Sequence, residues 1–145
     1  MEPYRRRIFY YETDRMAIVH NSNYLRIFEE ARLDHMYKSG ITYKRMEDEG
    51  VLIPQVEAYV KYIKPITYGD ELNIRVRMTE FNGVKVKYEY GLFVGDEEKP
   101  SATGYTAHCF LDDGTRNPVS IKKKIPEVYR RLMAAFEKDT SEKSE

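Results

Sequence analysis

Residues 20–40 read HNSNYLRIFEEARLDHMYKSG, and this stretch decides the fold. Its apolar residues recur with the period of one face of an α-helix. The members of this stripe are Tyr24, Ile27, Phe28, Ala31 and His35. The polar HNSN segment can cap the first turn, and Gly40 follows the last one. The stretch therefore predicts a long amphipathic helix over residues 24–37, whose apolar stripe needs another element to cover it.

Beyond this helix the apolar residues change to a period of two, which is typical of β-strands. The predicted strands cover residues 51–62, 72–79, 84–94 and 102–111. Asn82 and Gly83 separate the second strand from the third and predict a hairpin, because both residue types accept the positive φ that such turns require. Pro126 then predicts the start of a short C-terminal helix over residues 127–137.

The order of these elements predicts an α+β fold. A strand-like run before Asp14 completes a five-stranded, mostly antiparallel sheet, which is the only large apolar face able to cover the long helix. We predict one domain over residues 1–137, followed by a polar tail, residues 138–145, that is expected to be disordered. One helix covers only part of such a sheet, so the open edge or face is expected to pair with a second copy, giving a homodimer or a dimer of dimers.

Composition narrows the class of partner and the location. Lysine and arginine total 24, as do aspartate and glutamate, so no net basic field is available for nucleic acid. No stretch approaches the roughly 20 apolar residues of a membrane span, and the N-terminus lacks the apolar core of a signal peptide. With Cys109 as its single cysteine, the chain has no internal disulfide framework. We expect a cytoplasmic protein that binds a small molecule or another protein.

Several short segments at fixed spacing resemble the signature of hot-dog-fold acyl-CoA thioesterases of the 4-hydroxybenzoyl-CoA thioesterase type. They are Asp14, Ala17-Ile18-Val19, Asn23-Tyr24-Leu25, Phe28-Glu29 and Ala31-Arg32. The family pattern is an acid-containing loop, a Gly-Val-Val-like turn, an Asn-Tyr that starts the central helix, and an Ala-Arg further along it. The resemblance implies a sheet wrapped around the helix and a dimer with a ten-stranded sheet and active sites at its interface. It also implies hydrolysis of an acyl-CoA without a metal, and no cofactor is expected.

The resemblance places the catalytic acid at Asp14, as nucleophile or general base, and elementary chemistry is consistent with this role. Thioester hydrolysis needs a group that activates water or attacks the carbonyl, and donors for the charge that develops on its oxygen. A helix start offers free backbone N–H groups and a positive dipole end. Asp14 lies seven residues before Asn21, so a loop can bring its carboxylate back to that point. The predicted substrate-binding residues are Val19, His20, Asn21, Asn23 and Tyr24.

Simpler roles are possible for the same residues. A lone aspartate after a strand is usually solvated or turn-forming, and His20, Asn21 and Ser22 could serve only as helix caps. Many relatives carry glycine where this chain has Ala17, so the turn here must either avoid positive φ or tolerate some strain. Many also carry histidine at the position of Asn21, so a histidine-assisted mechanism is not expected here.

His108 and Cys109 are adjacent on a predicted strand, where their side chains leave on opposite faces. They cannot form a nucleophile–base pair, and both are expected to be packing residues. A non-catalytic acyl-CoA-binding or scaffolding protein is the alternative to an enzyme. A hot-dog hydratase is disfavoured, because no His-x-x-Gly segment appears in the sequence. The residues alone leave open the acyl group, CoA or acyl-carrier protein as carrier, an anhydride or an activated-water mechanism, dimer or tetramer, and the role of His20.

Overall fold

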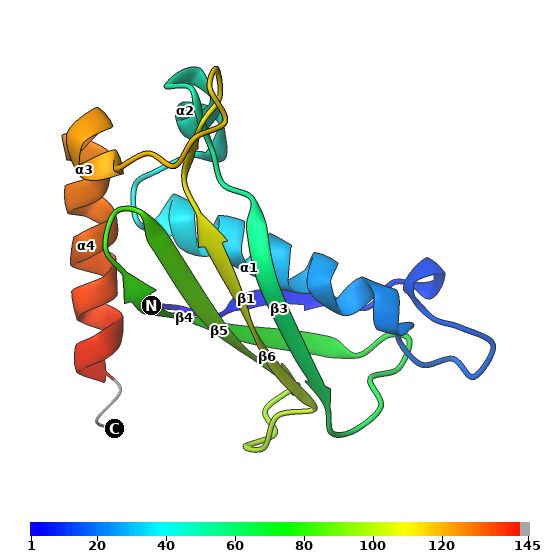
Figure 1. Cartoon of the computed structure of the whole chain (residues 1–145). Coiled ribbons are helices and arrows are strands. Elements are labelled where there is room, and N and C mark those ends of the chain that lie inside the picture. Colours follow the sequence, from blue (N-terminus) through cyan, green and yellow to red (C-terminus); the bar gives the residue numbers. More distant parts are fainter. Residues whose placement is uncertain (143–145) are drawn as a thin grey trace.

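Five strands form one antiparallel sheet in the computed structural model, which describes residues 1–142 (Figure 1). Their order is β1–β4–β5–β6–β3, and every neighbouring pair is antiparallel. The bounds are Tyr4–Arg7 for β1, Gln55–Tyr62 for β3, Glu71–Phe81 for β4, Lys85–Val94 for β5 and Ala102–Cys109 for β6. Two short strands, β2 (Val51–Leu52) and β7 (Leu111–Asp112), pair separately. The predicted α+β class is confirmed.

The long helix is α1, Tyr24–Lys38, one residue longer than predicted. Every member of its predicted apolar stripe is buried against the sheet. Gly40 follows the helix with a φ of 85°, the left-handed conformation that a glycine adopts easily after a helix end. A 3-10 turn, η2 (Asn21–Asn23), leads into the helix.

Phe28 of the helix packs closely against β5 and β6. The Phe28 ring stacks on Tyr90 with 4.3 Å between the ring centroids. A Cβ atom added at Gly104 would lie 2.6 Å from the Phe28 ring and would also clash with the main-chain oxygen of Tyr59. A glycine at this position on β6 therefore allows the helix to pack.

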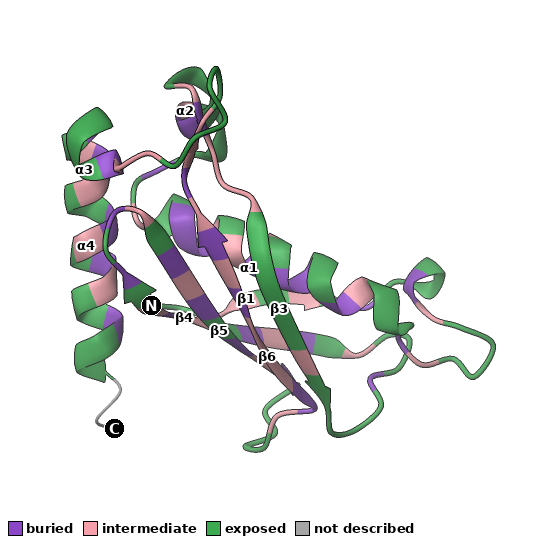
Figure 2. Cartoon of the chain, in the orientation of Figure 1, coloured by how far each residue is buried: buried purple, intermediate pink, exposed green. Residues whose placement is uncertain are grey.

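The predicted strand over residues 51–62 is divided at Pro54 into β2 and β3. β3 lies at the edge of the sheet, and Figure 2 shows it exposed over most of its length. Its pairing with β6 shifts register between Gln55 and Glu57, so Val56 lies at an irregularity and is 64% exposed. The alternating sequence was expected to bury one face of this strand, yet within one chain Val60 is half-buried and the other residues of the strand are exposed.

The hairpin predicted at Asn82-Gly83 joins β4 to β5. Gly83 has a φ of 86°, whereas Asn82 keeps a negative φ. The Asn82 carboxamide oxygen instead accepts hydrogen bonds from the backbone N–H groups of Val84 and Lys85, at 2.9 and 2.8 Å. The side chain of Asn82 thus closes the loop itself.

Three further helices complete the fold: α2 (Tyr43–Asp48) and α3 (Ile121–Lys124), neither of which was predicted, and α4 (Pro126–Ser141). The C-terminal helix extends beyond residue 137, so residues 138–141 are helical rather than a disordered tail. Asp139 is 2% exposed, and its Oδ2 accepts hydrogen bonds from His35 Nε2 and Met78 N, each at 2.8 Å. Residues 143–145 of the predicted tail lie outside the described residues. No helix within residues 1–142 is long and apolar enough to cross a membrane.

Candidate active site

Asp14 lies in a small hairpin rather than at the end of a strand. The run before it, which was expected to be a strand, forms a 3-10 turn, η1 (Tyr10–Glu12). Thr13 and Val19 then make an isolated antiparallel bridge, and Ile18 makes another with Thr67. The loop that carries Asp14 is therefore fixed by pairing with itself and with the segment before β4.

The tip of this hairpin is a turn closed by the N–H of Ala17, which donates to the carbonyl of Asp14 at 3.0 Å. Ala17 has a φ of 64°, the left-handed region that favours glycine. A turn followed by one left-handed residue is a common hairpin connection, with glycine normally in the last position. The sequence left two possibilities, a turn that avoids positive φ and a turn that tolerates some strain. Because Ala17 has a positive φ, the second is the case.

Glu12 ties this loop to the beginning of α1. Its main-chain oxygen accepts hydrogen bonds from the backbone N–H of His20 and from Asn23 Nδ2, both at 2.9 Å. Both oxygens of its carboxylate accept hydrogen bonds from Arg6 Nη2, at 2.9 and 2.8 Å. These contacts hold the two ends of the loop together, and the side chain of Asn23 serves to anchor it.

A cavity of about 470 Å³ opens between this loop and the end of β3. We call it the Asp14 cavity. Five of the six predicted site residues line it: Asp14, Val19, His20, Asn21 and Tyr24. Asn23, the sixth, does not line this cavity because its amide is directed at Glu12.

The carboxylate of Asp14 is exposed and only partly engaged. Its Oδ1 accepts a hydrogen bond from the N–H of Met16 at 2.8 Å, which fixes the side chain at the turn. No residue in the described part of the chain bonds to its Oδ2. One carboxylate oxygen is thus held and the other can reach a water or a carbonyl carbon.

The start of the helix supplies donors at the same cavity. His20 caps the turn through Nδ1, which accepts from Ser22 N at 3.1 Å and lies 2.8 Å from Ser22 Oγ. Asn21 is the first residue of η2, and the first N–H groups of a helical turn have no acceptor within it. No other residue within 1–142 accepts from the Asn21 N–H. This leaves a free main-chain donor in a residue that lines the cavity.

The far wall of the Asp14 cavity was not identified from the sequence. It consists of Tyr62, the last residue of β3, and of Ile63, Lys64 and Pro65, which follow the strand. Tyr62 makes an edge contact with Tyr24, with 4.8 Å between ring centroids, and Lys64 forms an ion pair with Glu97 at 2.8 Å. Local sequence carries no signal for this wall, because only the pairing of β3 with β6 brings it to the helix start.

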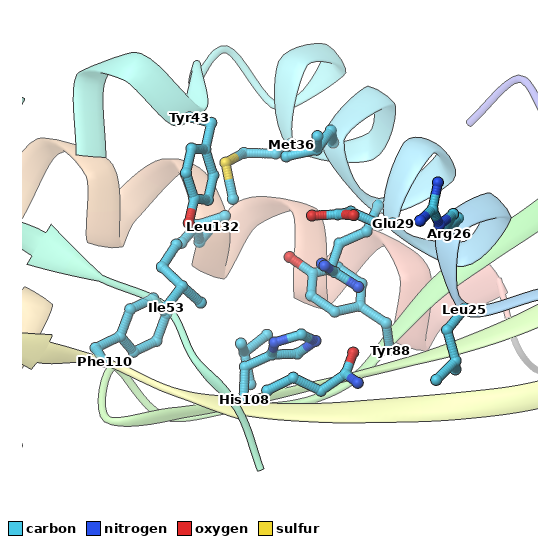
Figure 3. A pocket seen from close by; sticks show the side chains of 14 residues that line it. Leu25, Arg26, Glu29, Met36, Tyr43, Ile53, Tyr88, His108, Phe110 and Leu132 are labelled. Atoms are coloured by element: carbon cyan, nitrogen blue, oxygen red, sulfur yellow. The ribbon is translucent and has the colours of Figure 1, made fainter. Parts of the chain in front are cut away.

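A second cavity, of about 310 Å³, lies further along α1 (Figure 3). We call it the His108 cavity. Its walls come from α1, β5, β6 and α4, and include Arg32, Tyr88, His108 and Leu132. His108 is 1% exposed, as expected of a packing residue, but it also faces this cavity, whereas Cys109 does not line it. Within residues 1–142, no group of three or more His, Cys, Asp or Glu residues is arranged to hold a metal ion.

Comparison with known proteins identifies the family of the chain. A family model described as the thioesterase-like superfamily matches residues 10–134. The chain is 30% identical over 123 residues to a 1,4-dihydroxy-2-naphthoyl-CoA hydrolase of Picosynechococcus, covering 81% of this chain and 84% of that protein. The chain belongs to the thioesterase-like superfamily.

Two solved structures place this superfamily member among hot-dog proteins. A hypothetical protein from Aquifex aeolicus is 37% identical, with a TM-score of 0.78 over 87% of this chain and 97% of that one. A DHNA-CoA thioesterase from Staphylococcus aureus is 27% identical, with a TM-score of 0.84 over 92% and 91% of the two chains. The predicted hot-dog fold is confirmed, and at the level of the family the predicted thioester hydrolase is confirmed as well.

Proposed function

We propose that this protein hydrolyses an acyl-CoA thioester to a carboxylic acid and free CoA, with Asp14 as nucleophile or general base. The observation that carries the proposal is the Asp14 cavity, where a half-engaged carboxylate and the start of α1 meet. The names of relatives support CoA as the carrier, since the Picosynechococcus protein is named for hydrolysis of an acyl-CoA.

In this reaction the Asp14 carboxylate acts on the thioester carbonyl in one of two ways. It either takes a proton from a water that attacks the carbonyl carbon, or attacks that carbon itself to form an anhydride that water then cleaves. In both routes the C–S bond breaks, CoA leaves as a thiol after gaining a proton, and the acyl group leaves as the acid. The free N–H of Asn21 and the positive end of the helix would stabilise the negative charge on the carbonyl oxygen.

Replacing Asp14 with asparagine tests the assignment. Asp14→Asn keeps the size and the hydrogen bond from Met16 but removes the basic oxygen, so turnover should fall by about 10²- to 10⁴-fold, or more if Asp14 is the nucleophile. The measurement is thiol release from a panel of short, long and aromatic acyl-CoAs. Near-wild-type release by a folded Asp14→Asn protein would exclude the assigned role.

Two neighbouring variants serve as controls. Asn21→Ala keeps the main-chain N–H, so it should cost far less turnover than Asp14→Asn, with at most about 1 kcal/mol of stability lost from the helix start. His20→Gln should also remain active if His20 only caps the turn. If the His20→Gln protein is as inactive as Asp14→Asn, the role of general base belongs to His20. Failure of the wild type to cleave any acyl-CoA that it binds would favour the alternative of a non-catalytic binding protein.

A further inference from the structure

A single buried residue anchors the loop that carries Asp14, and this loop lies beside the beginning of α1 (Figure 1). Over residues 9–18, Glu12 alone is buried, at 5% exposed. The other two residues of η1, Tyr10 and Tyr11, are 77% and 79% exposed. No apolar side chain therefore ties this part of the loop to the core, and a carboxylate takes that place.

Five hydrogen bonds converge on Glu12. Its carboxylate accepts two from Arg6 Nη2, at 2.9 and 2.8 Å, and one from the N–H of Phe9 at 2.8 Å. Its main-chain oxygen accepts the other two, from His20 N and Asn23 Nδ2, at 2.9 Å each. The side chain is thus bonded to β1 and the main chain to the start of α1, so Glu12 fixes the loop between these two elements.

Arg6 holds the carboxylate from β1 and also contacts the helix. Its Nε lies 3.1 Å from Glu30 Oε1 on α1, so one planar guanidinium orients the loop and the helix together. The side chain of Arg6 is only 8% exposed, and its Nη1 is buried without a partner in the part of the chain that the structure describes. Replacing a buried ion pair by apolar residues is often neutral or stabilising, so stability alone does not account for these charges. What the pair provides is a directional, charge-assisted contact of fixed geometry.

The position of Asp14 follows from that of Glu12. Asp14 comes two residues later, and the intervening Thr13 is held by an antiparallel bridge. On the other side, His20 binds Glu12 through its N–H and directly precedes Asn21, the residue with the free N–H. Glu12 thus connects the carboxylate and the donor that the proposed hydrolysis requires.

We propose that Arg6 and Glu12 are positioning residues, which hold the Asp14 carboxylate opposite the N–H of Asn21. The inference rests on the proposed acyl-CoA hydrolysis and adds the residues that align its site. Neither Arg6 nor Glu12 lines the Asp14 cavity, so both act through Asp14 and not on the substrate. Misplacing a catalytic group by about 1 Å can cost about 10²-fold in rate. Loss of the pair should therefore lower kcat and leave substrate binding largely unchanged.

The first test replaces Glu12 and a matched carboxylate. Glu12→Gln keeps the size of the side chain but sets an amide NH₂ against Arg6 or the N–H of Phe9, so kcat for thiol release should fall by about 10- to 100-fold, with KM changed by less than about 3-fold. Glu71→Gln is the control, because Glu71 pairs with Arg7, the next residue of β1, at 3.3 Å, yet both side chains are exposed. This variant should keep the wild-type kcat. An unchanged kcat in a folded Glu12→Gln protein, or an equal loss in Glu71→Gln, would overturn the proposal.

A double variant distinguishes positioning from a general loss of order. If Glu12 acts through Asp14, its replacement should cost little in a protein that already lacks the carboxylate. The kcat of Asp14→Asn/Glu12→Gln should therefore lie within about 3-fold of that of Asp14→Asn alone. If the two losses multiply in full, Glu12 supports activity independently of Asp14 and the positioning role is excluded.

Amide hydrogen exchange separates this proposal from the proposed function, because it requires no substrate. In Glu12→Gln the His20 N–H, which bonds to the main chain of the anchored loop, should exchange about 10-fold faster or more. The Ser101 N–H, which bonds to Leu92 within the sheet at 2.7 Å, should exchange as in the wild type. If the wild type cleaves no acyl-CoA but the exchange of His20 rises, the hydrolase assignment fails and the anchoring by Glu12 stands. If thioesters are cleaved and the exchange of His20 is unchanged, the positioning role fails.

If Glu12→Gln does not fold, Arg6→Lys decides the question. A lysine keeps the charge, but its single ammonium lacks the planar fork that contacts Glu12 and Glu30 together. Arg6→Lys should lower kcat without a comparable rise in KM, whereas Arg7→Lys, on the exposed pair, should not. A folded Arg6→Lys protein with the wild-type kcat would contradict the proposal.

Discussion

At the scale of single residues, Ala17 shows how a sequence can mark a site without settling its conformation. Its neighbours predicted a turn, and the turn is present, but the choice between negative and positive φ depended on the bridge that closes the hairpin at Thr13 and Val19. That bridge forces the last residue of the turn into the left-handed region. The strain is therefore located in the loop that carries Asp14.

Ala17→Gly should relieve this strain. A left-handed residue other than glycine costs roughly 1–2 kcal/mol, while the added freedom of glycine in the unfolded chain offsets about 0.4–1 kcal/mol of this gain, so the variant should be up to roughly 1.6 kcal/mol more stable. Ala17→Val, with a β-branched residue at the same φ, should be less stable than the wild type. Urea unfolding midpoints of the three proteins measure the order. A glycine variant clearly less stable than the alanine protein would contradict the strain.

The predicted site residues were found together where local sequence determines their placement. Asp14 and the residues that start α1 are close in sequence, and one short loop brings five of the six to the same cavity. The wall formed by Tyr62 and Lys64 could not be found in this way, because its position depends on strand pairing. The same holds for His108, which hydrogen bonds link to Arg32 only through Thr106 and Tyr90, and not through a sequence motif.

At the scale of elements, the helix was predicted to within one residue because its stripe, its polar start and Gly40 are all local signals. β3 lies within the predicted strand over residues 51–62, but its burial was not predicted correctly. An alternating sequence shows that one face of a strand is apolar and does not show what covers that face. The helical continuation to Ser141 was missed for a similar reason. Asp139 is a polar residue type, which predicts exposure, yet its side chain is buried and hydrogen-bonded to His35, which lies 104 residues away in the sequence.

The contact of α1 with β6 gives a test of the packing between these elements. Gly104→Ala would press a Cβ against the Phe28 ring and the Tyr59 main chain, and overpacking of this kind costs about 1–3 kcal/mol. Gly91→Ala, on the neighbouring strand β5, is the matched control, because its Cβ would meet only the far end of the Phe93 ring, which can move. Unfolding free energies in urea should therefore fall much more for Gly104→Ala. Equal losses in the two variants would show that Gly104 does not set the helix position.

At the scale of the whole molecule, the exposed edge strand indicates that one chain is not the complete assembly. β3 has a neighbour on one side only, and its backbone groups on the other side are available for pairing. Large apolar side chains gather on and just after it, with Val56 64%, Tyr59 49%, Tyr62 53% and Ile63 48% exposed. An exposed apolar edge of this kind is usually covered by another chain.

We therefore expect the protein to sediment at about twice or four times its chain mass of 17.2 kDa at micromolar concentration. Val56→Lys should weaken this assembly, because a lysine on an edge strand opposes pairing and a two-fold interface contains the substitution twice. Ala134→Lys, on the exposed side of α4 at the opposite edge of the molecule, is the control and should leave the mass unchanged (Figure 2). The Asp14 cavity ends at Tyr62 and Ile63, beside the same edge, so thiol release should decline together with the assembly on dilution. A stable monomer with full activity would show that the edge needs no partner and that each chain carries a complete site.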